Sequence, residues 1–176
     1  ERDRRWLLND WAKTWVTTPG ISKYYVTSNP VHLSLPYPGA PTISYQVSHK
    51  SLADEHLQRK QQFQILLRTD QKDSRVLSFY FGGVNVGGST DGSLSKALFL
   101  EKHRILNDRD RPQLIFPNYG DYGYGIFLLD EKSRDYVLKN IQNEKDPFLR
   151  TMMWGALWDG VREGELDPRV FAELVV

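Results

Sequence analysis

The sequence contains no cysteine among its 176 residues. Disulfide bonds, cysteine-ligated zinc and a cysteine nucleophile are therefore excluded. Excess charge of either sign is also missing, because 23 Lys and Arg residues stand against 22 Asp and Glu residues and give a net charge of +1. That balance is not the basic footprint of a protein that binds nucleic acid or an anionic membrane surface. We expect neither as a partner.

Long apolar runs and targeting signals are absent as well. No run approaches the roughly 20 residues that a membrane-spanning helix needs, and no stretch has the pattern of a signal peptide. The compartment is not indicated by the sequence. The composition is that of an ordinary folded protein, and a chain of this length buries roughly 70% of its unfolded surface.

The common catalytic motifs do not occur either. There is no His-Glu-x-x-His, which would place two zinc ligands on one face of a helix, and no Gly-x-Ser-x-Gly around a nucleophile. The four histidines are scattered along the chain, at His32, His49, His56 and His103. We therefore predict no catalytic, cofactor-binding or metal-binding residue in this chain.

The middle of the chain, residues 21–129, has the period of β-strands. Apolar and polar residues alternate, or short apolar runs occur, in the segments 31–35, 42–48, 62–68, 76–81, 97–100, 114–116 and 126–129. Turn signals separate these segments, and the proline-rich residues 36–41 are typical of a hairpin connection. Residues 50–61 have no clear period and predict either a loop or a short helix. The pattern favours a mainly β fold, an antiparallel β-sandwich flanked by an N-terminal helix and C-terminal α-helices.

Helical patterns lie at both ends. Residues 1–18 place Trp11 and Trp15 on one face beside Leu8, and no capping residue precedes them, so we expect this helix to begin upstream. Together with Trp6, these tryptophans need a large apolar partner. A further helical pattern starts at about residue 130, with apolar residues at Val137, Leu138 and Ile141.

Two more helices are predicted to start with the same signal, Asp146-Pro147 and Asp167-Pro168. An aspartate accepts hydrogen bonds from the first free N–H groups, and proline suits the first helical position. Gly164 can end the first of these helices. That helix is apolar on two adjacent stripes, formed by Leu149, Met153 and Leu157 and by Trp154, Trp158 and Val161. No stop signal follows the second helix, so we expect the helical region to continue beyond residue 176.

Three segments are candidates for binding, and each has an ordinary structural interpretation. The glycine-rich residues 81–92 suit either a phosphate cradle or tight turns between strands, and no helix pattern follows them as a cradle requires. The aromatic turn at residues 117–125 carries Tyr119, Tyr122 and Tyr124, which either bind a sugar through their ring faces or pack over their own core. The mixed-charge residues 101–112 are typical of a solvated connection.

Three segments also resemble bacterial zinc aminopeptidases of the aminopeptidase N type. The run Trp154-Gly-Ala-Leu-Trp-Asp-Gly-Val-Arg-Glu-Gly-Glu-Leu166, with Arg150 before it, is similar to the family segment that opens its C-terminal helical domain. Pro117-Asn118 followed by Gly123-Tyr124-Gly125 resembles the turn that closes the family's small β-sandwich. Residues 11–21 are similar to the last helix of the catalytic domain, although Ser22 stands where the family usually has proline. The strands between these segments match only in pattern.

This resemblance implies a division into residues 1–20 (the end of a catalytic domain), 21–129 (the β-sandwich) and 130–176 (the start of the helical domain). The family's zinc motif and its Gly-x-Met-x-Asn strand lie upstream of such a segment and do not occur in this sequence. The resemblance thus implies a non-catalytic piece, which would position a helical lid relative to the zinc site of an enzyme that removes N-terminal residues from peptides. Its partners would be the catalytic and helical domains of the same polypeptide, and it would expose apolar surface at both ends.

A different class of function remains open. A free-standing β-sandwich module would bind carbohydrate or protein through the three tyrosines of the aromatic turn. A hydrolase with an unrecognised site is a third interpretation, but no constellation of residues supports it.

Overall fold

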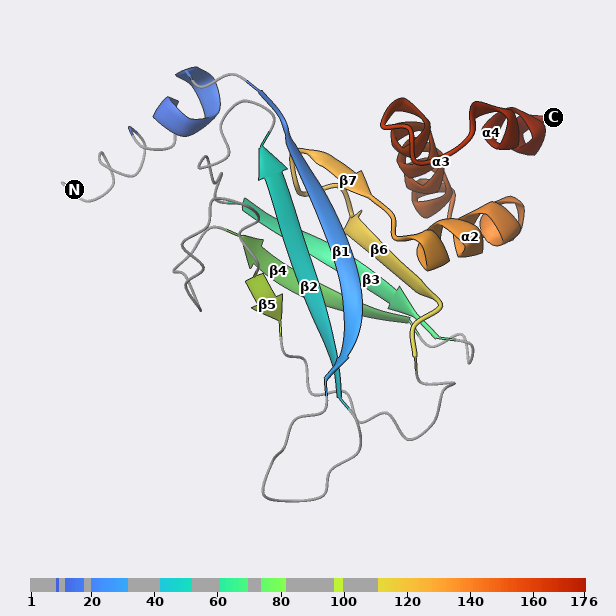
Figure 1. The fold of residues 1–176 in the computed structure, drawn as a ribbon, viewed down its shortest axis with the longest axis horizontal. Helices are drawn as coiled ribbons and strands as arrows, with labels where there is room; N and C mark the ends of the chain where they lie inside the picture. Colours follow the sequence, from blue (N-terminus) through green and yellow to red (C-terminus); the bar gives the residue numbers. More distant parts are fainter. Residues whose placement is uncertain are drawn as a thin grey trace.

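The fold is taken from a computed structural model, which describes residues 9, 12–17, 20–31, 42–51, 61–69, 74–81, 97–99 and 111–176. Its elements are the π-helix η1 (Lys13–Thr17), β1 (Ser22–Val31), β2 (Thr42–Ser51), β3 (Gln61–Arg68), β4 (Ser74–Phe81), β5 (Ala97–Phe99), β6 (Leu114–Tyr119), β7 (Ile126–Leu128), α2 (Glu131–Asn140), the 3₁₀ helix η3 (Ile141–Asn143), α3 (Pro147–Arg162) and α4 (Pro168–Val175). Figure 1 shows the strands in the middle of the molecule and α2, α3 and α4 together on one side.

The strands form two small sheets, in the orders β5-β2-β1-β7 and β4-β3-β6. Every pairing is antiparallel except that of β1 with β7, in which Lys23 lies opposite Ile126 and Tyr25 opposite Leu128. The observed class is therefore mixed α/β with two sheets rich in antiparallel pairs. The parallel pair departs from the purely antiparallel prediction. It joins strands about a hundred residues apart in sequence, which no local pattern reports.

The first strand lies earlier than the sequence predicts. The alternation at 31–35 predicted a strand there, whereas β1 runs from Ser22 to Val31 and residues 32–35 lie outside the described part. Tyr24 and Val26 enter the core, but the polar residues that follow them hide the alternation. β1 and β2 pair antiparallel from Val31 opposite Thr42 to Ser22 opposite Ser51, so the described strand that pairs with β2 begins at Ser22 and not at residue 31 as predicted. The connection itself, residues 32–41, is not among the described residues.

One core lies between the two sheets. Tyr24, Val26, Val47 and Phe127 come from the four-stranded sheet, and Phe63, Ile65, Leu67, Leu77 and Ile115 come from the three-stranded sheet. The rings of Tyr24 and Phe127 stack with centroids 4.8 Å apart, and Phe63 meets Phe127 edge-on at 5.0 Å. Three aromatic rings thus tie the sheets together near the start of β1.

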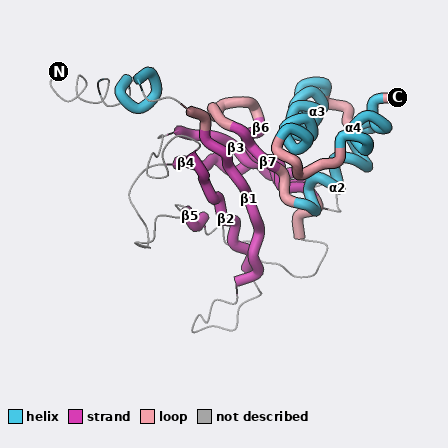
Figure 2. Tube along the Cα trace, turned by 45° about the horizontal axis from the view of Figure 1, so that its top comes forward, coloured by secondary structure: helices cyan, strands magenta, loops and turns pink. Residues whose placement is uncertain are grey.

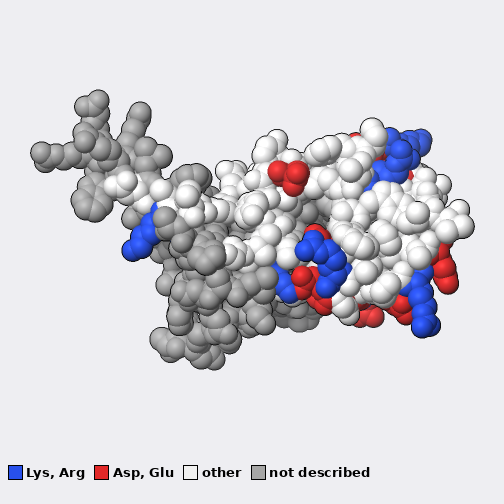
Figure 3. Space-filling model, turned by 90° about the horizontal axis from the view of Figure 1, so that it is seen from above, with Lys and Arg blue, Asp and Glu red and all other residues white. Residues whose placement is uncertain are grey.

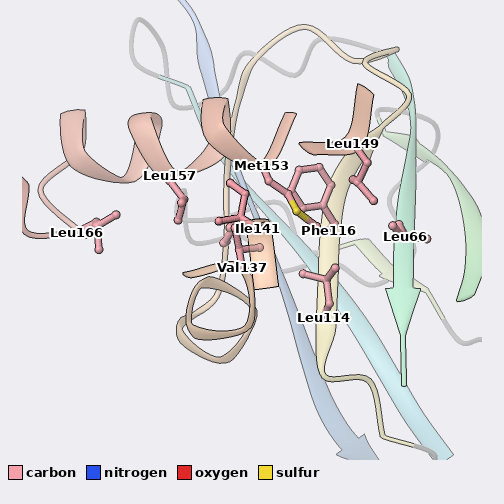
Figure 4. Packing of buried hydrophobic residues seen from close by; sticks show 10 residues of the cluster. Leu66, Leu114, Phe116, Val137, Ile141, Leu149, Met153, Leu157 and Leu166 are labelled. Carbon is pink, nitrogen blue, oxygen red and sulfur yellow. The ribbon is translucent and has the colours of Figure 1, made fainter. Parts of the chain in front are cut away.

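A second core lies between the three-stranded sheet and the helices. Its buried members are Leu66, Leu114, Phe116, Leu129, Val137, Ile141, Leu149, Met153, Leu157 and Leu166, most of which Figure 4 labels. Because side chains alternate across a strand, Ile65 and Leu67 face the first core while Leu66 between them faces the second. The molecule therefore has three layers, sheet, sheet and helices, with the helices at one side of both sheets in Figure 2.

The helix starts agree with the predicted caps. The Asp146 carboxylate accepts from the N–H of Phe148 at 2.9 Å, and the Asp167 carboxylate accepts from the N–H of Arg169 at 2.8 Å. Gly164 has a φ of +76° just after α3, which confirms its role as the residue that ends this helix.

At the other end, the described part of the predicted helix 1–18 is helical, with a π-helical turn at residues 13–17. Trp6 and Trp11 lie outside the described residues. The division at residues 20 and 129 stays a prediction, although the helices after residue 129 share a core with β3 and β6.

Candidate functional site

The segment that ends β6 and leads to β7 carries the three predicted binding tyrosines, and two of them are exposed. We call residues 118–125 the tyrosine turn. Tyr122 is 71% exposed and Tyr124 is 63% exposed. Tyr119 lies just before the point where the chain turns, and it packs against the core that the sheet shares with the helices. The structure therefore brings Tyr122 and Tyr124 to the surface and gives Tyr119 a structural place.

The tyrosine turn is held by the side chain of Asn118, which is only 6% exposed. The Asn118 amide nitrogen donates to the carbonyl of Gly123 at 3.0 Å and to the carboxylate of Asp121 at 3.2 Å, and its amide oxygen accepts from the N–H of Gly123 at 2.6 Å. Asn118 and Asp121 both have left-handed backbones, with φ of 55° and 57°. Such backbone is uncommon outside glycine and is best tolerated by Asn and Asp.

A second brace reaches the tyrosine turn from β3. The Gln61 amide oxygen accepts from the N–H of Tyr124 at 2.8 Å, and its nitrogen donates to the hydroxyl of the buried Tyr24. Gln61 thus connects the two sheets and the tyrosine turn through one side chain. From outside, the Trp15 ring meets Tyr124 edge-on at 5.9 Å. The two exposed tyrosines therefore stand on a rigid backbone, which is a suitable platform for a planar or apolar partner surface.

The described residues contain no group of three or more His, Cys, Asp or Glu side chains close enough to hold a metal ion. Of the histidines, only His49 falls in a described strand, and its side chain is not described; His32, His56 and His103 lie outside the described residues. The glycine-rich residues 82–92 and the mixed-charge residues 101–110 lie outside them too. The phosphate-cradle interpretation therefore stays untested.

The junction between the sheets and the helices is the second candidate site; two ion pairs cross it, and a third joins α2 to the turn after α3. Lys23 of β1 pairs with Glu163 after α3, and Arg68 of β3 pairs with Glu144 after η3. Arg134 of α2 lies 3.8 Å from Glu165. On the face drawn in Figure 3, charges of both signs are interspersed among uncharged atoms and neither sign forms a separate patch.

The Arg68–Glu144 pair changes the titration of both groups. Burial alone would raise the pKa of Glu144, but hydrogen bonds from Arg68 and from the backbone N–H of Asp146, with the charge of Arg68, lower it below the ordinary value. Burial opposes the charged form of Arg68 as well, yet the bond and charge of Glu144 raise the Arg68 pKa. The pair is therefore ionised throughout the neutral range.

Exposed apolar residues gather on the helices. Phe148, Trp158, Val170 and Val175 are all exposed. The Phe171 ring lies 5.6 Å from both the Trp154 and the Trp158 rings, so these tryptophans already have one helical neighbour in α4. At the other end Val16 is exposed.

Sequence reasoning missed Gln61, Lys23 and Glu163 as contacts between elements. Gln61 has no motif around it, and the partners of Lys23 and Gln61 lie far along the chain. The one signal in the sequence is the position of Lys23 and Gln61 near apolar residues of β1 and β3. Such a position predicts the face of the sheet on which each side chain lies, but not the residue that it contacts.

No protein-family model matches this chain, and no curated protein matches it either. Within the described part of the chain, no helix has both the length and the apolar character needed to cross a bilayer.

Proposed function

We propose that this chain is the non-catalytic β-sandwich and linker portion of a bacterial zinc-dependent aminopeptidase. In this proposal the two sheets form the β-sandwich, and α2, α3 and α4 open the helical domain that covers the active site. Zinc and the catalytic residues belong to the part of the parent polypeptide upstream of this chain. The chain's own task is positional, because it sets the distance and angle between the zinc site and its helical lid.

The observation that carries the proposal is where the family-like residues lie. Asn118 and Gly123, from one of the resembling segments, brace the tyrosine turn that joins β6 to β7. Leu157 and Leu166, from the Trp-rich segment, are buried in the core that the three-stranded sheet shares with the helices, and Gly160 lets Leu166 approach α3 closely. The residues that carry the resemblance are thus those that join the layers, as a positional part requires.

The rigidity of the junction supports the same conclusion. Burial of a Leu or Met side chain contributes roughly 2 kcal/mol, and the second core holds ten buried residues. The Arg68–Glu144 pair adds a directional contact from β3 to the segment between η3 and α3. A helical layer fixed in this way cannot tilt freely on the sheet.

The test compares this chain with the product of the whole reading frame that encodes it. Both are purified and assayed for bound zinc and for release of the N-terminal residue from aminoacyl-4-nitroanilides. We expect the whole product to hold stoichiometric zinc and to cleave, with activity lost on chelation, while the chain alone does neither. A whole product without zinc and without aminopeptidase activity would refute the proposal.

The tyrosine turn favours a second candidate, a β-sandwich module that binds carbohydrate or protein. Tyr122 and Tyr124 are exposed on backbone held by Asn118 and Gln61, and preorganised rings lose little entropy when a partner binds.

This candidate is tested by a glycan array and a peptide array probed with the chain and with its Tyr122→Ala/Tyr124→Ala variant. The exposed Val175→Ala change serves as the matched control. Binding that the double variant loses and the control keeps would support the module. If the chain bound nothing on either array, this candidate function would be refuted.

A further inference from the structure

The turn between α3 and α4 is held by oppositely charged residues from two other elements. Its two carboxylates, Glu163 and Glu165, stand on either side of Gly164. Lys23 of β1 pairs with Glu163, and Arg134 of α2 lies 3.8 Å from Glu165. Tyr25, two residues after Lys23 on the same strand, also faces this turn: burial and then the charge of Glu165 raise the pKa of its hydroxyl.

The residue between the carboxylates has no side chain to pack, and its N–H donates to the carbonyl of Val161 at 3.1 Å. Gly164 has a φ of +76°, and a Cβ built on it would meet no atom within 4 Å. Glycine crosses between backbone regions at little steric cost, so no packing at this position opposes a change of direction. The turn is otherwise held by the N–H groups of Glu165 and Leu166, which donate to the carbonyl of Gly160 at 2.8 and 3.1 Å, and by the buried Leu166 side chain.

The helix that follows is weakly attached. No residue of α4 is buried. Its described contacts include the Phe171 ring against Trp154 and Trp158, the partly buried Phe171 and Leu174 side chains against the second core, and a hydrogen bond from the Gln142 side chain to the Leu174 carbonyl at 2.9 Å. Figures 1 and 2 both show α4 on the outer side of the helical layer, away from the sheets. Its direction therefore depends on how the preceding turn is held.

We propose that Glu163 and Glu165 form an ionic latch, which fixes the α3–α4 turn to β1 and α2 and so sets the direction of α4. When the latch opens, the chain rotates at Gly164 and α4 swings with its Asp167 cap intact. The latch is a property of this chain and does not depend on the proposed parent enzyme. A negative result in the latch experiment would not affect the aminopeptidase proposal, and a protein without aminopeptidase activity could still have the latch.

The test uses the absence of native cysteine, which lets spin labels be placed only where they are wanted. Labels at the exposed positions Ser28→Cys in β1 and Glu173→Cys in α4 report the direction of α4 by pulsed electron paramagnetic resonance. The latch variant is Glu163→Gln/Glu165→Gln, which keeps size and removes charge. The control is Arg162→Gln, which breaks the Asp159–Arg162 pair within α3 and no contact between elements.

We expect a broader distribution of label distances in the latch variant than in the wild type. The backbone amides of Glu165 and Leu166 should exchange hydrogen about fivefold faster, which corresponds to the upper end of the free energy that a solvent-accessible ion pair contributes. High salt should shift the wild type in the same direction and leave the latch variant unchanged. If the latch variant does not fold, Lys23→Gln, which opens one side only, is measured in its place with the same expected direction. A distance distribution and exchange rates equal to those of Arg162→Gln would overturn the proposal.

Discussion

The side chain of Asn118 and the backbone of Gly123 hold each other through two hydrogen bonds, one donated in each direction, at 3.0 and 2.6 Å. These two bonds close the tyrosine turn in the way that a pair of backbone hydrogen bonds would. The backbone of Asn118 itself is left-handed. Asparagine suits this place because it can both donate and accept and because it tolerates that backbone.

Replacement of Asn118 by alanine should destabilise the protein by about 2–4 kcal/mol. The change leaves the buried N–H and carbonyl of Gly123 without their partner and forces alanine into a left-handed backbone. Urea denaturation followed by tryptophan fluorescence measures the effect. Asn118→Gly is the matched control, because it loses the same hydrogen bonds without the backbone strain, and it should be less destabilised by roughly 1 kcal/mol. Equal losses of unfolding free energy in Asn118→Ala and Asn118→Gly would contradict the expected cost of a left-handed backbone at residue 118.

Two glycines should respond to alanine in opposite directions. A Cβ at Gly123 would lie 2.7 Å from the Phe127 ring and 3.1 Å from the Phe63 Cβ, both in the core between the sheets. Gly123→Ala should therefore cost about 1–3 kcal/mol. A Cβ at Gly155, in the exposed middle of α3, would meet nothing within 4 Å. Gly155→Ala should stabilise the protein by about 1 kcal/mol. Thermal unfolding of both variants checks the signs, and a melting temperature raised by Gly123→Ala would contradict this packing.

The stability of the protein should depend on the Glu144 carboxylate at acidic pH. Its pKa in the folded protein lies below the ordinary value of 4.5, so its contribution is complete above that value. The contribution is lost as the pH falls through the lower pKa of the folded state. Glu144→Gln should therefore be less stable than the wild type near neutral pH, and the difference should shrink in acid.

Urea midpoints across this pH range measure the difference. Glu173→Gln, an exposed change in α4, serves as the matched control. A Glu144→Gln difference that stays constant down to the most acidic pH would contradict the ion pair with Arg68.

The features predicted from the sequence are the ones that local chemistry decides. The caps at Asp146 and Asp167 and the helix end at Gly164 depend on a few neighbouring residues, and the structure confirms them. β3 and β4 lie where alternation predicts them, but Leu66 is buried as well, because the helices cover the second face of the sheet. Burial on both faces is a tertiary property, which alternation cannot report.

The sequence alone did not distinguish among the three candidate tyrosines, Tyr119, Tyr122 and Tyr124. Which ring faces the solvent is decided by the left-handed backbone at Asn118 and Asp121, which separates Tyr119 from Tyr122 and Tyr124. The brace from Gln61 joins residues 63 positions apart. Such contacts arise from strand pairing across the fold and could not be read from spacing.

The central claim is that α2, α3 and the three-stranded sheet form one rigid body, since a positional part must not bend at this junction. Native-state hydrogen exchange as a function of low urea concentration tests it most directly, by comparing the backbone amides of β3, β6 and α3. The account predicts that these amides share one opening free energy, equal to that of global unfolding. Amides of α3 that open at a clearly lower free energy than those of β3 and β6 would contradict it.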